Sequence, residues 1–269
     1  AVAGDWQEPH LQTPAQRAKR MLKGWVGELI TSDAVGNTIG LLTGNHFRSR
    51  GLRVDTSHPA IKPEIKATLF WDVYESAEIR FVRRYLRKDI DVVELGASLG
   101  IMVCQIRDHV DAERKVVCVE ASPQLAPVIR RNLELNGFAE NTPVITAAID
   151  YSGTKTVSFW EGGNNLQGFK DEKGTTVVPA LTLEQLLADH QIGDYALVCD
   201  IEGAEAGIIF QGRKSLDRCQ QIVFELHDTV LDGRKIFVDE MIEELVKGHG
   251  FRYVDRYGTA CVFDRNLSA

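Results

Sequence analysis

The chain has 269 residues, of which 44% are hydrophobic and 26% are charged, as in an ordinary globular protein. This length suits one large domain, or one domain with an added segment. No apolar run approaches the roughly 18 residues of a membrane span, and the N-terminal stretch lacks the apolar core of a signal peptide, so we expect neither feature. The net charge of −7 weighs against an extended nucleic-acid-binding surface, which usually needs a basic face.

The cysteines and one basic run bear on compartment and partners. None of the five cysteines forms a C-x-x-C pair, and each lies in or beside an apolar segment, so we expect reduced, buried thiols in a cytoplasmic protein. The basic run consists of Arg80, Arg83, Arg84, Arg87 and Lys88. We interpret it as the solvated face of a helix rather than as a phosphate-binding patch.

The chain divides near residue 70 on the basis of its patterning. Residues 1–70 are predicted to form an N-terminal extension of helical and irregular structure that covers the acceptor side of a site, and residues 71–269 the main domain. Within the extension, residues 14–30 carry apolar side chains at helical spacing. The segments 52–58 and 66–76 suit either strands or loops.

Beyond the extension, predicted strands and helices alternate. A helix is expected from Glu75 to about Arg87. The predicted strands are 91–95, 115–120, 143–149, 195–200 and 220–226, and the predicted helices are 99–110, 123–136, 183–190, 204–213 and 234–249. Residues 156–160 and 175–179 are predicted to be two short inserted strands, and residues 251–265 a hairpin that turns at Gly258 and Thr259. Such alternation indicates a doubly wound α/β sheet with right-handed crossovers.

A sheet of this kind binds its ligand at the carboxyl ends of its strands, and acidic residues occur at most of the predicted ends. The first turn, "VVELGASLG", contains Gly96 and Gly100, which let backbone approach a ligand. It lacks the full G-x-G-x-x-G of a pyrophosphate site. Glu120 ends the second strand, where an acid can accept both hydroxyls of a ribose. A ribose site without a pyrophosphate cradle favours a nucleoside with a compact polar tail, such as S-adenosylmethionine.

The order of these motifs resembles class I S-adenosylmethionine-dependent methyltransferases, and within them the FkbM-type family. The resemblance covers about residues 70–265 and rests on E-x-G-x-x-x-G, "VEASP", "NLELNG", "AAIDYSG", "LVCDIEGAE" and "IVFELH". It implies a Rossmann-like seven-stranded sheet with an antiparallel C-terminal hairpin, S-adenosyl-L-methionine as cofactor, and methylation of hydroxyls, often of sugars or polyketides. The family usually has Asp-x-Gly-Ala-Asn in the first turn, whereas this chain has Glu94 and Ser98.

The resemblance also implies a set of cofactor-binding residues. They are Tyr74, Glu75, Glu94, Gly96, Ala97, Ser98, Glu120, Ala121, Ala148, Ile149 and Asp200. Residues 96–98 would wrap the methionine part and Glu120 would hold the ribose. Residues 121 and 148–149 would flank the adenine, and residues 74–75 would close the pocket.

The acceptor site is predicted from "LVCDIEGAE" and "IVFELH". A hydroxyl is a poor nucleophile, so a base that takes its proton helps the transfer. We predict His227 as that base, oriented by Asp200 or Glu225, while Glu205 either takes part or only favours the N-terminus of its helix. The predicted contacts to a hydroxyl-rich acceptor come from Glu202, Asn164, Asn165 and Trp160. The carboxylates at positions 200, 202, 205 and 225 and the imidazole of His227 would also suit Mg²⁺ or Mn²⁺. A divalent metal is the less favoured alternative, and no residue is assigned as a metal ligand.

The sequence thus predicts an O-methyltransferase for a hydroxyl of a sugar, a glycan, or a glycosylated or polyketide natural product. Its partners are then a small-molecule or glycan acceptor, with no nucleic acid and no integral membrane segment. Two alternatives stay open. One is a methyltransferase for nucleic acid or protein, and the other is a noncatalytic binding module that kept the cofactor fold. The acceptor, the hydroxyl position and the oligomeric state do not follow from the sequence.

Overall fold

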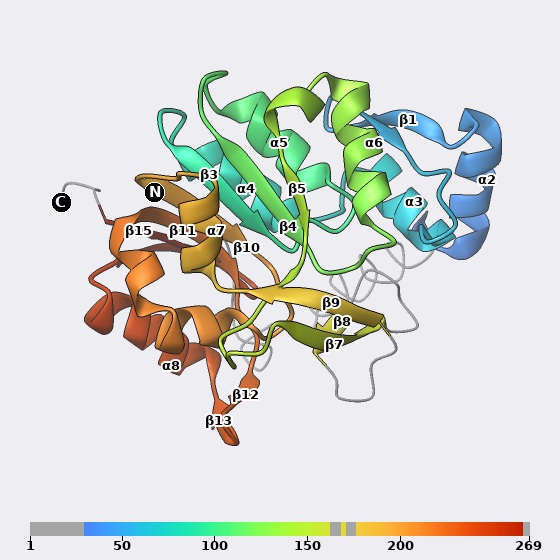
Figure 1. Cartoon of the computed structure of the whole chain (residues 1–269). Coiled ribbons are helices and arrows are strands. Elements are labelled where there is room, and N and C mark those ends of the chain that lie inside the picture. The colour runs from blue at the N-terminus through green and yellow to red at the C-terminus, as the bar shows by residue number, and fades with distance from the viewer. Residues whose placement is uncertain (1–29, 162–167, 171–175, 266–269) are drawn as a thin grey trace, which may run out of the picture.

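The computed structural model describes residues 30–161, 168–170 and 176–265, and its centre is a seven-stranded sheet (Figure 1). The strand order is β14-β15-β11-β10-β3-β4-β5. Five strands are parallel, namely β3 (Asp91–Leu95), β4 (Val116–Glu120), β5 (Val144–Thr146), β10 (Tyr195–Cys199) and β11 (Cys219–Glu225). The antiparallel hairpin of β14 (Arg252–Tyr257) and β15 (Ala260–Asp264) turns at Gly258 and Thr259, as predicted.

Helices cover both faces of the sheet. The first layer contains α4 (Ser76–Tyr85), α5 (Ile101–His109) and α6 (Ala126–Asn136), and the second contains α7 (Leu183–Asp189) and α8 (Val238–Glu243). Successive strand residues face opposite layers. Val92 of β3 therefore packs with the first layer and Val93 with the second. The predicted Rossmann-like doubly wound fold is confirmed.

Two helix boundaries illustrate how local sequence defines these elements. The helix α6 ends at Asn136 because Gly137 takes a left-handed conformation with φ of 76°. At the start of α7, the Thr182 side chain accepts from the Gln185 amide and the Gln185 side chain accepts from the Thr182 amide. The predicted N-cap is thus present as a complete capping box.

The described part of the N-terminal extension packs beside α6 (Figure 1). It contains α2 (Asp33–Thr43), a hairpin of β1 (His46–Ser49) and β2 (Leu52–Asp55), and α3 (Pro63–Phe70). The ambiguous segment 52–58 therefore begins as a strand, and the segment 66–76 begins as the end of a helix. Leu52, Val54 and Leu69 belong to the same hydrophobic core as α5 and α6. The predicted helix 14–30 lies almost wholly outside the described residues.

The prediction of one strand over 143–149 was wrong. β5 ends at Thr146, and after Ala147 the chain leaves the main sheet as β6 (Ala148–Ile149). β6 pairs in parallel with β9 (Thr176–Leu181), which also pairs with β7 (Thr156–Glu161). With β8 (Gly168–Lys170), these strands form a second sheet in the order β6-β9-β7-β8. An uninterrupted apolar run does not reveal a change of pairing partner.

The predicted helices 204–213 and 234–249 were also partly wrong. The first is a short turn that continues as a π-helix over Gly207–Gln211, and after Gly212 the chain forms a 3-10 helix over Arg213–Arg218. The second region begins with β13 (Arg234–Ile236), which pairs with β12 (Thr229–Leu231) in a projecting hairpin (Figure 1). Only α8 and the π-helical Glu244–Gly248 that continues it are helical there.

No helix in the described part of the chain is long and apolar enough to span a bilayer.

Candidate active site

A cavity of about 1240 Å³ lies at the carboxyl ends of β3, β4, β10 and β11. Most of the predicted site residues line it, namely Tyr74, Glu75, Gly96, Ser98, Glu120, Ala121, Ala148, Ile149, Asp200, Glu202, Glu225 and His227. Glu94 and Ala97 are buried and are not among the residues of its wall. Asn164 and Asn165 lie outside the described residues, and of Trp160 only its place in β7 is described.

The first turn meets the end of β10 directly. Gly96 has φ of 86°, and a β-carbon there would lie 1.7 Å from the carbonyl oxygen of Asp200. The amide of Asp200 in turn donates to the carbonyl of Leu95. Only glycine fits this contact, because its backbone is left-handed and no side-chain atom can be accommodated. Gly96 thereby positions the two parts of the site against each other.

Glu120 is held by backbone amides at the mouth of β4. One carboxylate oxygen accepts from the Ser98 amide and the other from the Ser122 amide, each at 2.7 Å. Each carboxylate oxygen can accept a second hydrogen bond. The residue is therefore fixed in position on the wall of the cavity.

Two further carboxyl groups in this half lack such partners. Both carboxylate oxygens of Glu94 and Oε2 of Glu75 are buried without a hydrogen bond to the described residues. Burial, followed by the charge of Glu120, raises the pKa of Glu94 to about 8. Burial and then Glu94 raise the pKa of Glu75 well above its ordinary value. Glu94 therefore holds a proton at neutral pH unless a cation compensates its charge.

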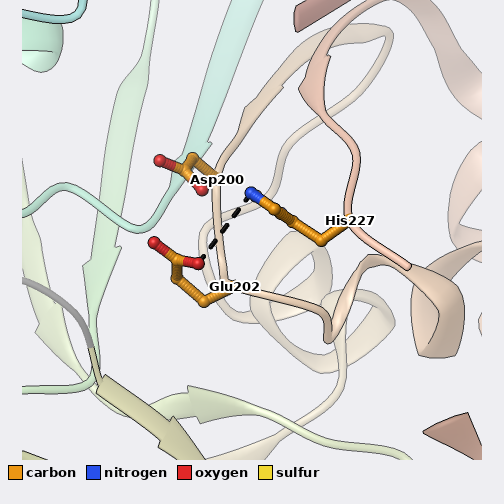
Figure 2. A group of neighbouring side chains, drawn as sticks. All are labelled: Asp200, Glu202 and His227. Carbon is orange, nitrogen blue, oxygen red and sulfur yellow. Dashed lines mark ion pairs between the residues drawn. The ribbon is translucent and has the colours of Figure 1, made fainter. Parts of the chain in front are cut away.

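In the other half, Asp200, Glu202 and His227 point toward one another (Figure 2). His227 Nε2 lies 3.9 Å from Glu202 Oε2 and 3.7 Å from Glu225 Oε1. Its Nδ1 lies 3.7 Å from Glu205 Oε1. The ring is thus surrounded by carboxylates that follow β10 and end β11.

Glu205 has a structural task in this half. Its side chain is fully buried, with 0% of its surface exposed, and accepts from the amides of Ile201 and Gly203 at 3.0 and 2.8 Å. These bonds fold the loop that presents Glu202, whose backbone is left-handed with φ of 53°. Glu205 therefore does more than favour a helix terminus, because it shapes the loop after β10.

The charges of this cluster set its protonation. Burial and then Glu225 and Glu202 raise the pKa of Asp200 to about 8. The interaction with Glu205 raises the pKa of His227 to about 9, against the opposing effect of burial. At neutral pH the ligand-free protein thus holds His227 as an imidazolium, which cannot accept a proton. The predicted role of His227 as general base meets this physical obstacle. Asp200 is likewise mostly protonated at neutral pH, so either group can act as the base only after a bound cation has lowered its pKa. Asp200 also has an unpartnered buried oxygen, Oδ1.

Several residues of the cavity wall had not been predicted. They include Lys62, Ile65, Tyr151, Gln211 and the hairpin residues 229–232. The hairpin had a local signal, since Asp232-Gly233 is a typical two-residue turn and both residues have positive φ. Lys62 and Ile65 had none, because only the docking of α3 brings them to the cavity.

The cavity fits the cofactor predicted from the sequence. Its volume accommodates a nucleoside with a polar tail, and carboxyl groups line it at the ends of β4 and β10. Together with the seven-stranded sheet and its reversed last strand, this defines an S-adenosylmethionine-dependent methyltransferase of class I. The model of the methyltransferase FkbM domain matches residues 95–253, which is more than half of the chain. The protein belongs to the FkbM methyltransferase family.

Comparison with curated proteins gives no match. Among solved structures, a putative RNA methyltransferase from Pyrococcus horikoshii is 12% identical over 74% of this chain and 84% of its own, with a TM-score of 0.43. The O-methyltransferase from Bacillus cereus in complex with SAH is 13% identical over 70% and 78%, with a TM-score of 0.42. An uncharacterized protein from Listeria monocytogenes serotype 4b is 11% identical over 72% and 69%, with a TM-score of 0.42.

Proposed function

We propose that the protein methylates a hydroxyl group of an uncharged polyol, such as a sugar that is free or part of a glycan or natural product. The acidity of the cavity carries this proposal. Its acidic wall residues are Glu75, Glu120, Asp150, Asp200, Glu202, Glu225 and Asp232. Among the described wall residues, Lys62 is the only lysine or arginine. Hydroxyls donate to carboxylates, whereas a phosphate-rich acceptor is repelled by them.

The basic run on α4 supports the same choice of acceptor. Arg83 contacts Asp108 at 2.9 Å and Arg87 contacts Asp89 at 2.8 Å. Arg80 and Arg84 lie over aromatic rings, with Arg80 4.7 Å from the ring centre of Tyr257. These guanidinium groups are engaged within the protein, which favours the interpretation as a structural helix face over a phosphate-binding patch.

For the cofactor we propose the roles implied by the family. Glu120 holds the ribose, residues 96–98 surround the methionine part, and residues 121 and 148–149 flank the adenine. Tyr74, whose hydroxyl lies 3.0 Å from Ser98 Oγ, closes the pocket together with Glu75. When bound, S-adenosylmethionine supplies an electrophilic methyl group.

On the acceptor side we propose Asp200 as the group that takes the hydroxyl proton. When a bound cation compensates its charge, Asp200 becomes a carboxylate, and the burial that raises its pKa to about 8 in the ligand-free protein makes it a stronger base than an exposed aspartate. Glu225, which accepts from Thr259 Oγ1 at 2.6 Å, and His227 would orient the acceptor. Glu202 would border it, and the insert residues Trp160, Asn164 and Asn165 stay proposals from the sequence.

We further propose that residues 1–70 wall the acceptor side of a methyltransferase domain over residues 71–269. Lys62 and Ile65 of the extension, which line the cavity, support this division. All five cysteines are buried free thiols, which fits the proposed cytoplasmic location.

A transfer assay with tritiated S-adenosylmethionine tests the acceptor class. Sugars, glycolipids, RNA and protein would be offered in parallel, and the product analysed for O-methyl groups by mass spectrometry. We expect label in a polyol. Label only in RNA or protein would overturn the proposal.

The role of Asp200 is tested with the variant Asp200→Asn in the same assay. Its matched control is Asp194→Asn, because Asp194 directly precedes β10, which Asp200 follows, and makes only an exposed ion pair with Arg218.

A further inference from the structure

We propose that Asp200, Glu202 and His227 form a binding site for one divalent cation, of the Mg²⁺ or Mn²⁺ type. The three side chains converge from the loop after β10 and the end of β11 (Figure 2). Each offers one ligand atom, and these atoms all lie within 4.8 Å of one another. Donors about 2.1 Å from an octahedral cation stand about 3.0–4.2 Å apart. Small side-chain rotations therefore suffice to close the site.

Unsatisfied atoms distinguish this cluster from an ordinary acidic surface. Asp200 Oδ1 and His227 Nδ1 are buried and have no hydrogen-bond partner among the described residues. The neighbouring acids are satisfied, since Glu205 accepts from two amides and Glu225 from Thr259. Buried polar atoms in native proteins normally have partners. A cation supplies the partner that Asp200 Oδ1 lacks. His227 Nδ1 instead lies 3.7 Å from Glu205 Oε1, and the ring nitrogen beside Glu202 is Nε2.

The local charge leads to the same conclusion. Four carboxylates, those of residues 200, 202, 205 and 225, surround a single imidazole. None of the described lysines or arginines forms an ion pair with any of the four. One imidazolium does not balance four carboxyl groups at a partly buried site, and a bound cation offsets the cost of ionising them. Carboxylate oxygens with one imidazole are ligands that Mg²⁺ and Mn²⁺ accept.

The catalytic role of the cation rests on the proposed function. Its binding is independent of that function. All three ligands line the cavity, so coordination positions left open by the protein face the acceptor. Two neighbouring hydroxyls of a polyol can occupy such positions. The cation would lower the pKa of the reacting hydroxyl, so that a weak base is enough to take its proton. Asp200 offers the cation one ligand atom, and its second carboxylate oxygen would take that proton.

The test is binding of Mn²⁺ to the full chain after treatment with EDTA, followed by electron paramagnetic resonance of the free ion. We expect saturable binding of one Mn²⁺ per chain, weakened at least about 10-fold in Glu202→Gln and in His227→Gln. Asp194→Asn, a change directly before the start of β10, should bind Mn²⁺ as the wild type does. Two separate ligand variants are used so that one unstable variant does not decide the result, and circular dichroism checks folding.

Calorimetric binding of S-adenosylmethionine and the polyol assay are run on the same samples. Absence of saturable Mn²⁺ binding, or equal binding by wild type and both ligand variants, overturns the cation site. Methyl transfer to a polyol that continues unchanged in EDTA overturns its catalytic part and leaves the proposed function intact. Conversely, Mn²⁺ binding without methylation of any polyol supports the site and contradicts the proposed acceptor.

Discussion

The two halves of the cavity differ in how their acids are held. Glu120, at the end of β4, receives a backbone amide on each carboxylate oxygen. Asp200, at the end of β10, has a buried oxygen with no hydrogen-bond partner among the described residues. The nearby His227 has a buried nitrogen, Nδ1, that forms no hydrogen bond with the described residues and lies 3.7 Å from Glu205 Oε1. The Glu120 carboxylate is already fixed by hydrogen bonds and can position a ligand. The Asp200 carboxyl group gains its missing partner only when a ligand binds, and we place the chemistry there.

A single glycine holds these two halves together, and changing it should have the largest effect. In Gly96→Ala the new β-carbon would lie 1.7 Å from the Asp200 carbonyl oxygen. Left-handed strain and overpacking together should lower the free energy of unfolding by about 2–4 kcal/mol. Urea unfolding and calorimetry should show this loss together with lost cofactor binding.

Gly137→Ala is the control for that substitution. Gly137 is also left-handed, with φ of 76°, but a β-carbon there meets nothing within 4 Å. It should cost only about 1 kcal/mol. Equal losses in the two variants would show that the contact between the halves is unimportant.

Asp200→Asn should separate activity from stability. The amide cannot take the hydroxyl proton, so kcat should fall by about 10²–10⁴-fold. The same change removes a poorly compensated buried charge, so the ligand-free protein should melt about 2–4 °C higher at pH 8. Steady-state kinetics and calorimetric melting measure the two effects. Full activity in this variant would remove Asp200 from the chemistry.

Glu120→Gln tests the completed half. The substituted amide loses an acceptor oxygen and the charge that strengthens bonds from hydroxyls, so S-adenosylmethionine should bind about 10–100-fold more weakly. Glu134→Gln is the control, since Glu134 makes only a 3.6 Å ion pair with Arg131 at the surface. Calorimetric titration gives both affinities. Unchanged affinity in Glu120→Gln would mean that the ribose is held elsewhere.

The smallest effect per measured step is a gradual slope in stability against pH for the ligand-free protein in EDTA. The pKa of Glu94 and that of Asp200 are both raised to about 8. Between about pH 4 and pH 8 the native state binds more protons than the unfolded chain, so stability should fall as pH rises through this range. Each group contributes less than about 1.4 kcal/mol per pH unit. Glu94→Gln should reduce the slope, and a melting temperature that rises with pH would contradict the protonated state of these acids.

Local sequence accounts for most of the sheet but not for all of its pairings. The alternation of apolar segments predicted elements that the structure confirms within a few residues. The glycine after Asn136 marked a helix end, and the capping box at Thr182 marked a helix start. The split of 143–149 into β5 and β6 was not visible, because both parts are apolar and extended. The hairpin at Asp232-Gly233 was missed although its turn signal is present, since apolar residues at helical spacing followed directly after it.

The sequence by itself determined the fold class, the family and the acids at the strand ends, since periodicity and motif order are local properties of the chain. Only the tertiary structure decided what each acid does. It bonded Glu120 and Glu205 to backbone amides, and it left Asp200 Oδ1 and His227 Nδ1 without hydrogen-bond partners among the described residues. It also brought Gly96 against Asp200 and α3 against the cavity. Burial, charge proximity and hydrogen bonding arise between segments far apart in the chain, and these interactions set the protonation and the ligand chemistry of the site.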